Sequence, residues 1–138
     1  MNDVIIAGIG LTPVGEHWEI SLRDLAVQAI LLALRDSGGL KPQALFAANS
    51  LAPNLSRQAN LGTLLADYAG LGGIEATAIE LGGASGGAAL RQAALAVESG
   101  FIDVALFQQF QGFPAMDVHG VALELAHQPA LRAIFPQS

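Results

Sequence analysis

Short apolar runs alternate with segments of helical period along residues 4–107, and this alternation constrains the fold more than any other feature. Apolar runs typical of strands occupy residues 4–7, 44–49, 76–81 and 103–107. Between them, apolar side chains recur every three or four positions, as on one face of a helix, over residues 22–34, 60–71 and 85–99. Strands joined through helices by short connections pair in parallel. The sequence therefore predicts an α/β fold: a mostly parallel sheet of about four to five strands with helices on both faces.

Several local signals refine this prediction. The apolar run at residues 4–7 is expected to be a strand that is buried on both faces. Ser21, followed three positions later by Asp24, resembles a capping box at the start of the first helix. The stretch "DSGG" at residues 36–39 predicts the end of that helix.

The last part of the chain departs from the alternation. Residues 118–134 are expected to form one helix, interrupted at Pro129, and no fifth strand is predicted there. No linker or low-complexity segment divides the sequence. The chain is therefore expected to be one domain over residues 1–138, with residues 110–138 as a divergent tail that carries a C-terminal helix.

The composition limits the classes of partner. Hydrophobic residues make up 52% of the chain and charged residues 13%, about half the charged share of an average soluble domain. Such a chain has few charges to cover a free surface, which suggests that part of the surface is covered by a partner. The net charge of −6 disfavours nucleic acid and anionic membranes as partners. The N-terminus lacks the features of a signal peptide and no apolar stretch approaches the ~20 residues of a membrane helix, so a cytoplasmic location is expected.

Several sequence motifs do not match functional sites. The chain has no cysteine, which excludes disulfides, thiolate metal sites and thiol catalysis by its own residues. In "GIGLTPVG", residues 8–15, Pro13 stands where a dinucleotide fingerprint needs its third glycine. His119 and His127 are eight positions apart and do not match the spacing of a helical metal pair. The sequence therefore predicts no cofactor and no metal.

Ser85 lies in "GASGG", which formally fits the Gly-x-Ser-x-Gly pattern of a nucleophile elbow. Candidate acid and base partners follow it in the chain: Asp103, Asp117, His119, Glu124 and His127. The predicted sheet has too few strands for a serine hydrolase of that architecture. The favoured interpretation is that Ser85 is the N-cap of the third helix, with its hydroxyl bound to the first free amides.

Three segments, residues 4–38, 46–71 and 76–107, resemble the N-terminal half of thiolases. The sterol-carrier-protein type, which includes proteins similar to acetyl-CoA acetyltransferases, is the most similar. "ATAIELGGASGGAALRQAALAVESGFIDVALF", residues 76–107, is the most specific of the three segments. Ketoacyl synthases share the fold and the nucleophile turn, so an ancestry among them also stays open.

The resemblance implies where the reactive residue of the family would lie. In thiolases the third strand leads into a Cys-x-Ser-Gly turn, and the cysteine accepts the acyl group at the start of a buried helix. In "GASGGAAL" the cysteine position falls on Gly83, which offers no nucleophile, so no catalytic residue is assigned in this chain. The family's activating histidine and second cysteine would correspond to positions beyond residue 138.

The turn could still bind an acyl carbonyl or another anion through the free amides at the start of the helix. The alternative, which is favoured, is that its small residues only allow the helix to pack closely on the sheet. The residues of this turn are Gly82, Gly83, Ala84, Ser85, Gly86 and Gly87.

The resemblance also implies a dimer, because the third strand of thiolases pairs with its counterpart across a two-fold axis. The residues concerned here are Thr77, Ile79 and Leu81. The leading hypothesis is a catalytically inactive thiolase-like subunit, a pseudoenzyme of lipid metabolism in a complex that handles acyl-CoA. Its partner would be a second copy, a thiolase or an OB-fold acyl-CoA-binding protein, with a CoA thioester as the ligand. The alternatives are one half of a split acyltransferase, whose partner supplies cysteine and histidine, and a gene fragment without function.

Overall fold

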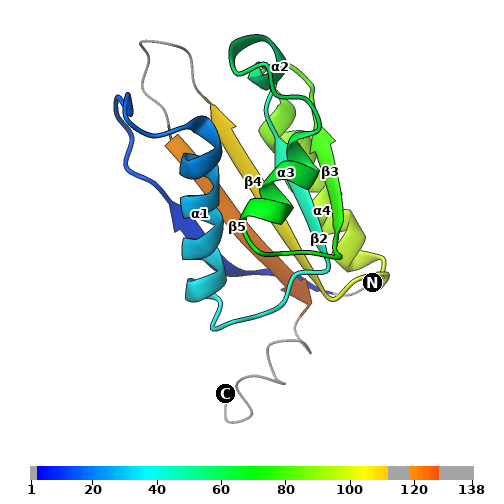
Figure 1. Ribbon diagram of the computed structural model, residues 1–138. Helices are drawn as coiled ribbons and strands as arrows, with labels where there is room; N and C mark the ends of the chain where they lie inside the picture. The colour runs from blue at the N-terminus through cyan, green and yellow to red at the C-terminus, as the bar shows by residue number, and fades with distance from the viewer. Residues whose placement is uncertain (1–2, 112–118, 128–138) are drawn as a thin grey trace.

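The computed structural model describes residues 3–111 and 119–127, which form one five-stranded sheet with helices on both faces (Figure 1). This confirms the predicted α/β fold. The elements in chain order are β1 Val4–Leu11, α1 Leu22–Asp36, β2 Ala44–Ala48, α2 Ala52–Leu55, α3 Leu61–Tyr68, β3 Glu75–Ile79, α4 Ser85–Glu98, β4 Val104–Gln111 and β5 His119–His127. The helices predicted at 22–34, 60–71 and 85–99 and the strands predicted at 44–49, 76–81 and 103–107 are all present, with ends displaced by a few residues. The short helix α2 was not predicted.

The strand order is β1-β5-β4-β2-β3. β2 pairs in parallel with both β3 and β4, while β5 runs antiparallel to its two neighbours, β4 and β1. Four strands therefore point the same way and β5 is reversed. The sheet is mostly parallel, as predicted.

The strand β5 corrects the prediction for the end of the chain. The helix predicted over residues 118–134 is wrong over 119–127, where "HGVALELAH" forms a strand. The reason is its period: Ala122 contributes to the core beneath α1, while Leu123 and Leu125 contribute to the core beneath α4. Such alternation between the two faces is the period of a strand. Residues 128–138 lie outside the described part of the chain, and the single-domain prediction stays a prediction.

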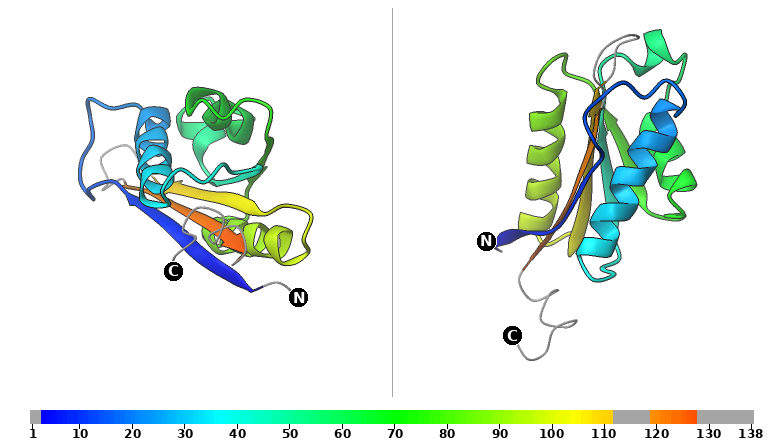
Figure 2. Two further views of the ribbon diagram at one scale, coloured as in Figure 1. Left: turned by 90° about the horizontal axis from the view of Figure 1, so that it is seen from below. Right: turned by 90° about the vertical axis from the view of Figure 1, so that its left-hand side faces the viewer.

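The helices lie in two layers. α1 lies across β1 and β5, and α3 lies beside it over β2 and β3, on the same face of the sheet. α4 lies on the opposite face, mainly over β4 and β2 (Figure 2). Each face has its own core, formed by small and branched apolar residues of the helices and the central strands.

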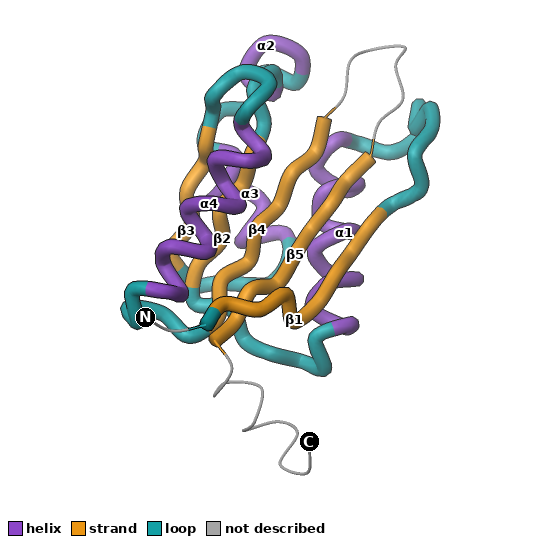
Figure 3. The backbone as a smooth tube through the Cα atoms, turned by 180° about the vertical axis from the view of Figure 1, so that it is seen from behind, coloured by secondary structure: helices purple, strands orange, loops and turns teal. Residues whose placement is uncertain are grey.

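The prediction that the first strand is buried on both faces is wrong. β1 is an edge strand and continues to Leu11. Ile6, Ile9 and Leu11 are 56%, 54% and 55% exposed. The reason is the position of α4, which covers β4 and β2 and leaves the same face of β1 largely open (Figure 3).

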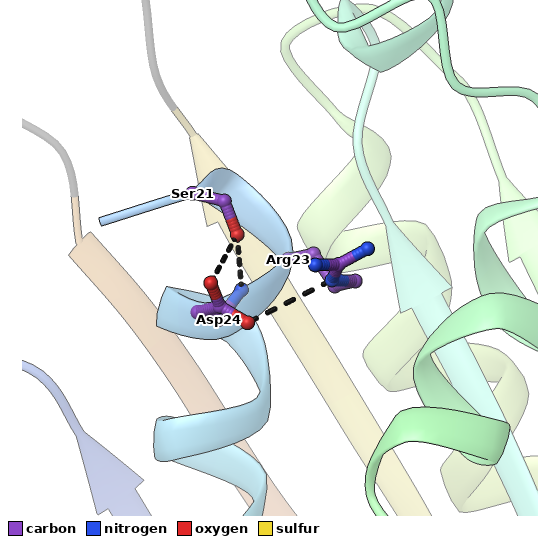
Figure 4. A network of polar contacts seen from close by, with 3 residues as sticks. All are labelled: Ser21, Arg23 and Asp24. Carbon is purple, nitrogen blue, oxygen red and sulfur yellow. Dashed lines mark hydrogen bonds and ion pairs between the residues drawn. The ribbon is translucent and has the colours of Figure 1, made fainter. Parts of the chain in front are cut away.

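The start and end of α1 agree with the sequence signals. Ser21 is the N-cap: its hydroxyl oxygen accepts a hydrogen bond from the amide of Asp24 at 3.0 Å and donates one to the Asp24 carboxylate at 2.6 Å (Figure 4). The helix ends at Asp36, and Gly38 and Gly39 then adopt positive φ angles of 76° and 88°. The predicted N-cap at Ser21 and the stop signal are confirmed.

Two glycines of "GIGLTPVG" have a structural purpose. Gly8 and Gly10 lie within β1, directly beneath α1. A Cβ atom at Gly8 would overlap the carbonyl oxygen of Ala33, and one at Gly10 would overlap that of Ala29. These glycines therefore allow the backbones of α1 and β1 to approach each other closely.

Candidate functional site

The glycine-rich turn between β3 and α4 lies at the carboxyl end of the parallel strands, where α/β proteins commonly bind ligands. Backbone hydrogen bonds close it: the amide of Ala84 donates to the carbonyl of Leu81 at 3.0 Å, and that of Ser85 to Gly82 at 3.3 Å. Gly82 has a φ of 53°, in the left-handed region that favours glycine. The turn is therefore a defined structure rather than an open loop.

Ser85 stabilises this turn and does not cap the helix. The N-cap of α4 is Ala84, and Ser85 is the first residue of the helix. The Ser85 hydroxyl donates to the carbonyl of Gly82 at 2.7 Å and accepts from the amide of Leu81 at 2.8 Å. The predicted N-cap role is therefore wrong, because the hydroxyl points back into the turn. Ser85 is 5% exposed and its hydrogen is already donated, which does not fit an activated nucleophile.

Gly83 differs from Gly82, which has a positive φ, and from Gly86, which is closely packed. It is exposed, its φ is not positive, and a Cβ atom built there would meet nothing within 4 Å. At Gly86, by contrast, a Cβ would displace the side-chain amide of Gln109. Packing therefore explains Gly86 but does not require glycine at position 83. The side chain that the resemblance implies at this position would have had room.

A small polar cavity borders the turn. Its volume is about 10 Å³, enough for about one water molecule. The cavity is lined by Ala48, Asn49, Ser50, Gly82, Gly83, Ser85, Gly86 and Gln109. Asn49 accepts hydrogen bonds from the amides of Leu51 and Ala52 at 2.8 and 2.5 Å, so its side chain is held in place. The cavity can hold one small polar group; acyl or anion binding at the turn stays a prediction.

The predicted dimer strand lies at an edge of the sheet. β3 pairs with β2 on one side, and within the described residues its other edge has no strand beside it. Thr77 and Ile79 lie in β3 and are half-buried, while Leu81, two residues after its end, is 61% exposed. Pairing of β3 with a second copy stays a prediction.

Glu124 is a buried carboxyl group on the other face of the sheet, beneath α1, and its special environment was not predicted from the sequence. It is fully buried, and its Oε2 lies 2.7 Å from Ser37 Oγ, which also donates to the carbonyl of Leu34 at 3.0 Å. The Ser37 hydroxyl has one hydrogen and a carbonyl can only accept, so both bonds form together when Glu124 is protonated. Burial raises the pKa of Glu124 to about 7, although the hydrogen bond from Ser37 to the ionised form would lower it.

The other candidate residues do not assemble into a hydrolytic site. Glu124 bonds to Ser37 at the end of α1, whereas Ser85 begins α4 on the opposite face of the sheet. Asp103 lies just before β4, at the end of the sheet opposite to the turn. His119 and His127 begin and end β5, and Asp117 lies outside the described residues. In the described part of the chain, no three His, Asp or Glu side chains gather as metal ligands and no helix could span a membrane.

Comparison with known proteins identifies the relatives of this chain. No family model matches it. An acetyl-CoA acetyltransferase from Methanothermobacter thermautotrophicus is 39% identical over 108 residues, which are 77% of this chain and 28% of that protein. The acetyl-CoA acetyltransferase of Syntrophomonas wolfei superposes with a TM-score of 0.71 at 20% identity, over 80% of this chain and 29% of that one.

A second solved structure covers the whole chain. OleA of Xanthomonas campestris, with bound lauric acid and lauroyl-CoA, superposes with a TM-score of 0.73 at 14% identity, over 100% of this chain and 59% of OleA. At these identities the two structures show a shared fold. The chain spans a little over a quarter of the curated relative that it matches. Sequence and fold together show that this chain carries a fragment of the thiolase superfamily.

Proposed function

We propose that this chain is a non-catalytic thiolase-like subunit that serves as a structural or interaction partner in a complex handling acyl-CoA in lipid metabolism. The observation that carries the proposal is Gly83: the turn is formed, there is space for a side chain, and none is present. Covalent acyl transfer needs a nucleophile, and the sequence has no cysteine. Ser85, the neighbouring hydroxyl, is engaged within the turn.

An exposed apolar surface supports the interaction role. We call it the β1 strip; it consists of the exposed Ile6, Ile9 and Leu11, together with the half-buried Leu123 beside Ile9. Ile9 pairs with Leu123, and Ile6 with Leu125, which belongs to the core beneath α4. Because directly paired residues of neighbouring strands lie on the same face, the strip faces the side of α4.

The β1 strip is unusual for the free surface of a monomer. Each of its three β1 side chains is more than half exposed, and α4 covers β4 and β2 instead (Figure 3). A contiguous exposed apolar patch typically marks an interaction surface. The low charged content of the chain agrees with a surface that is covered in the working complex.

The candidate partners are a full-length thiolase, an OB-fold acyl-CoA-binding protein and a second copy of this chain. The names of the relatives support an acyl-CoA context. The free edge of β3 supports a second copy, because an unpaired strand can add to another sheet edge. A CoA thioester bound at the assembled site is the corresponding ligand.

One half of a split acyltransferase is the second candidate function. The open position at Gly83 favours it, because a side chain of a partner could enter the space beside the start of α4. In this case the partner supplies the cysteine and the histidine. The complex would then catalyse acyl transfer and would need this chain for its full rate.

The test is to purify the tagged chain under mild conditions from its own organism, to measure the native mass by light scattering and to identify stoichiometric partners by mass spectrometry. Thioester cleavage and condensation are then assayed for the chain, the partner and the complex. If this chain is an interaction subunit, it should be inactive alone, and the rate of the partner should be the same with and without it. If the two chains form a split enzyme, only their complex should be active. A monodisperse monomer without a partner would contradict both proposals.

A further inference from the structure

A second cavity lies on the face of the sheet that carries α1 and α3, opposite to α4. Its volume is about 330 Å³, within the range of small-molecule sites. The start of α1, the segment of α2 and the start of α3 form its walls. The cavity is lined by Ser21, Leu22, Arg23, Ala52, Ser56, Gln58, Leu61 and Leu64.

The lining separates into an apolar and a polar part. Ala52 and Leu61 are buried, and Leu22 and Leu64 are half-buried, so these four side chains present an apolar wall. The polar lining consists of two serines, one glutamine and Arg23, which is the only charged residue among the lining residues. A cavity with an apolar wall and one cation fits a small ligand that has an anionic head and an apolar tail.

Arg23 is held in position, yet part of its hydrogen-bonding capacity is unused. Its guanidinium stacks on the ring of Tyr68, with the central carbon 4.0 Å from the ring centre. Its Nε lies 3.7 Å from a carboxylate oxygen of Asp24, too far for a hydrogen bond (Figure 4). This Nε is buried and has no acceptor among the described residues.

The geometry favours an external anion at this guanidinium. Stacking on Tyr68 uses the face of the group. Because Nε is buried, an external anion would bind at the terminal amino groups of the guanidinium. Asp24 forms an ion pair with Arg23 at 3.7 Å, while its other carboxylate oxygen accepts a hydrogen bond from the Ser21 hydroxyl at 2.6 Å. Asp24 therefore gives Arg23 no hydrogen bond. We propose that this cavity binds a small amphipathic carboxylate, with the head on Arg23 and a tail of a few carbons along Leu22, Leu61 and Leu64.

This site is separate from the turn at Gly83, so the inference does not depend on the proposed function. The first experiment titrates the isotope-labelled chain with hexanoate and follows the amide signals by NMR. The amides around the cavity are expected to shift in a saturable way. Hexan-1-ol has the tail without the charge, and inorganic phosphate has the charge without the tail. The dissociation constant of each should be at least about tenfold higher than that of hexanoate. Absence of saturable shifts with hexanoate, or equal binding of either probe, would overturn the proposal.

Variants then test the assigned residues. Arg23→Gln should weaken hexanoate binding about tenfold or more, and Arg23→Lys should retain part of it. The matched control is Arg91→Gln, which removes an exposed arginine from α4 on the opposite face and should leave binding unchanged.

Ser56→Phe provides a test that leaves Arg23 in place. Ser56 is exposed and lines the cavity, so a phenylalanine there should block the cavity at little risk to the fold. Loss of hexanoate binding in Ser56→Phe would support the site even if Arg23→Gln does not fold. Unchanged binding in Ser56→Phe, or in a folded Arg23→Gln, would contradict it.

Discussion

The two faces of β1 differ sharply. On one face, Gly8 and Gly10 lie so close to α1 that a Cβ atom would collide with the helix backbone. On the other face, Ile9 and Leu11 carry large apolar side chains that are more than half exposed. Glycines lie on the face that packs against α1, and large apolar residues lie on the face that the described part of the chain leaves uncovered.

The four residues "GIGL" at 8–11 therefore meet two different requirements, one on each face of the strand. The glycine face meets a requirement of the fold itself, because a larger residue would displace α1. The Ile/Leu face stabilises this chain less, since exposed side chains bury little area. The faces should therefore respond to mutation in different ways: one through stability and the other through association.

The largest expected effect is on the glycine face. Gly10→Val should lower the free energy of unfolding by about 3 kcal/mol or more, because the new side chain collides with the backbone of α1 at Ala29. Urea unfolding followed by circular dichroism measures this. The control is Gly83→Ala, at a position with open space, which should change stability by about 0.5 kcal/mol or less. Equal effects at the two positions would contradict the close packing of α1 on β1.

The second prediction concerns pH and the same closed face, where Glu124 pairs with Gly8. The pKa of Glu124 is about 7 in the folded protein, against 4.5 without burial. Below pH 4.5 the protonated Glu124 makes its full contribution to the free energy of unfolding. This contribution is lost as the pH rises through about 7, which lowers the free energy of unfolding by at most about 3 kcal/mol.

Glu124→Gln isolates this effect, because an amide cannot ionise and can still donate to Ser37. Urea unfolding at pH 5 and at pH 9 should show that the natural chain loses more stability at high pH than the variant does. Identical pH dependence in both proteins would show that the carboxyl does not ionise from a buried position.

The third prediction addresses the open face. The double variant Ile9→Thr/Leu11→Thr places a β-branched residue, which favours a strand, at both positions and should change stability by about 1 kcal/mol or less. It should weaken association with the partner, or with a second copy, by about tenfold or more. Light scattering and pull-down with the natural chain as reference measure this.

The control for the open face is Leu31→Gln/Leu32→Gln, which removes two exposed apolar side chains from α1. It should leave association unchanged. Loss of association in both double variants would indicate nonspecific hydrophobic association rather than binding by the β1 strip.

The smallest expected effect is at the turn before α4. Gly83→Cys should change stability by about 0.5 kcal/mol or less, because a side chain there meets nothing within 4 Å. The new thiol would be the single one in the chain and exposed, so thiol reagents should label it stoichiometrically. Its pKa should lie below that of a thiol introduced by Gln92→Cys in the middle of α4, since a helix N-terminus favours the thiolate. Equal thiol pKa values would show that the start of α4 does not stabilise an anion.

The predictions from sequence succeeded where local signals and burial agree. Ser21 and the glycines after Asp36 mark both ends of α1, and its apolar stripe faces the sheet. β2 was recognised because it is a central strand, whose every residue is buried. In these segments the local sequence pattern and the tertiary packing favour the same secondary structure.

The failures lie where position in the sheet decides. β5 was predicted as a helix, because leucine and alanine are good helix formers and the run is short. The open face of β1 was missed because an apolar run does not reveal whether a helix lies over it. Ser85 was assigned to the wrong bonds, since its distance from the backbone of Gly82 depends on the shape of the turn.

The sequence by itself determined the α/β class, the helix ends, the absence of a thiol at position 83 and the relationship to thiolases, because each of these depends on residue types and local spacing. Only the tertiary structure decided that β5 enters between β1 and β4, that one face of β1 is left open, and that Arg23 borders a cavity beneath the start of α1. These features depend on which helix lies over which strand. Residues distant in the sequence control that choice through packing, which no local pattern records.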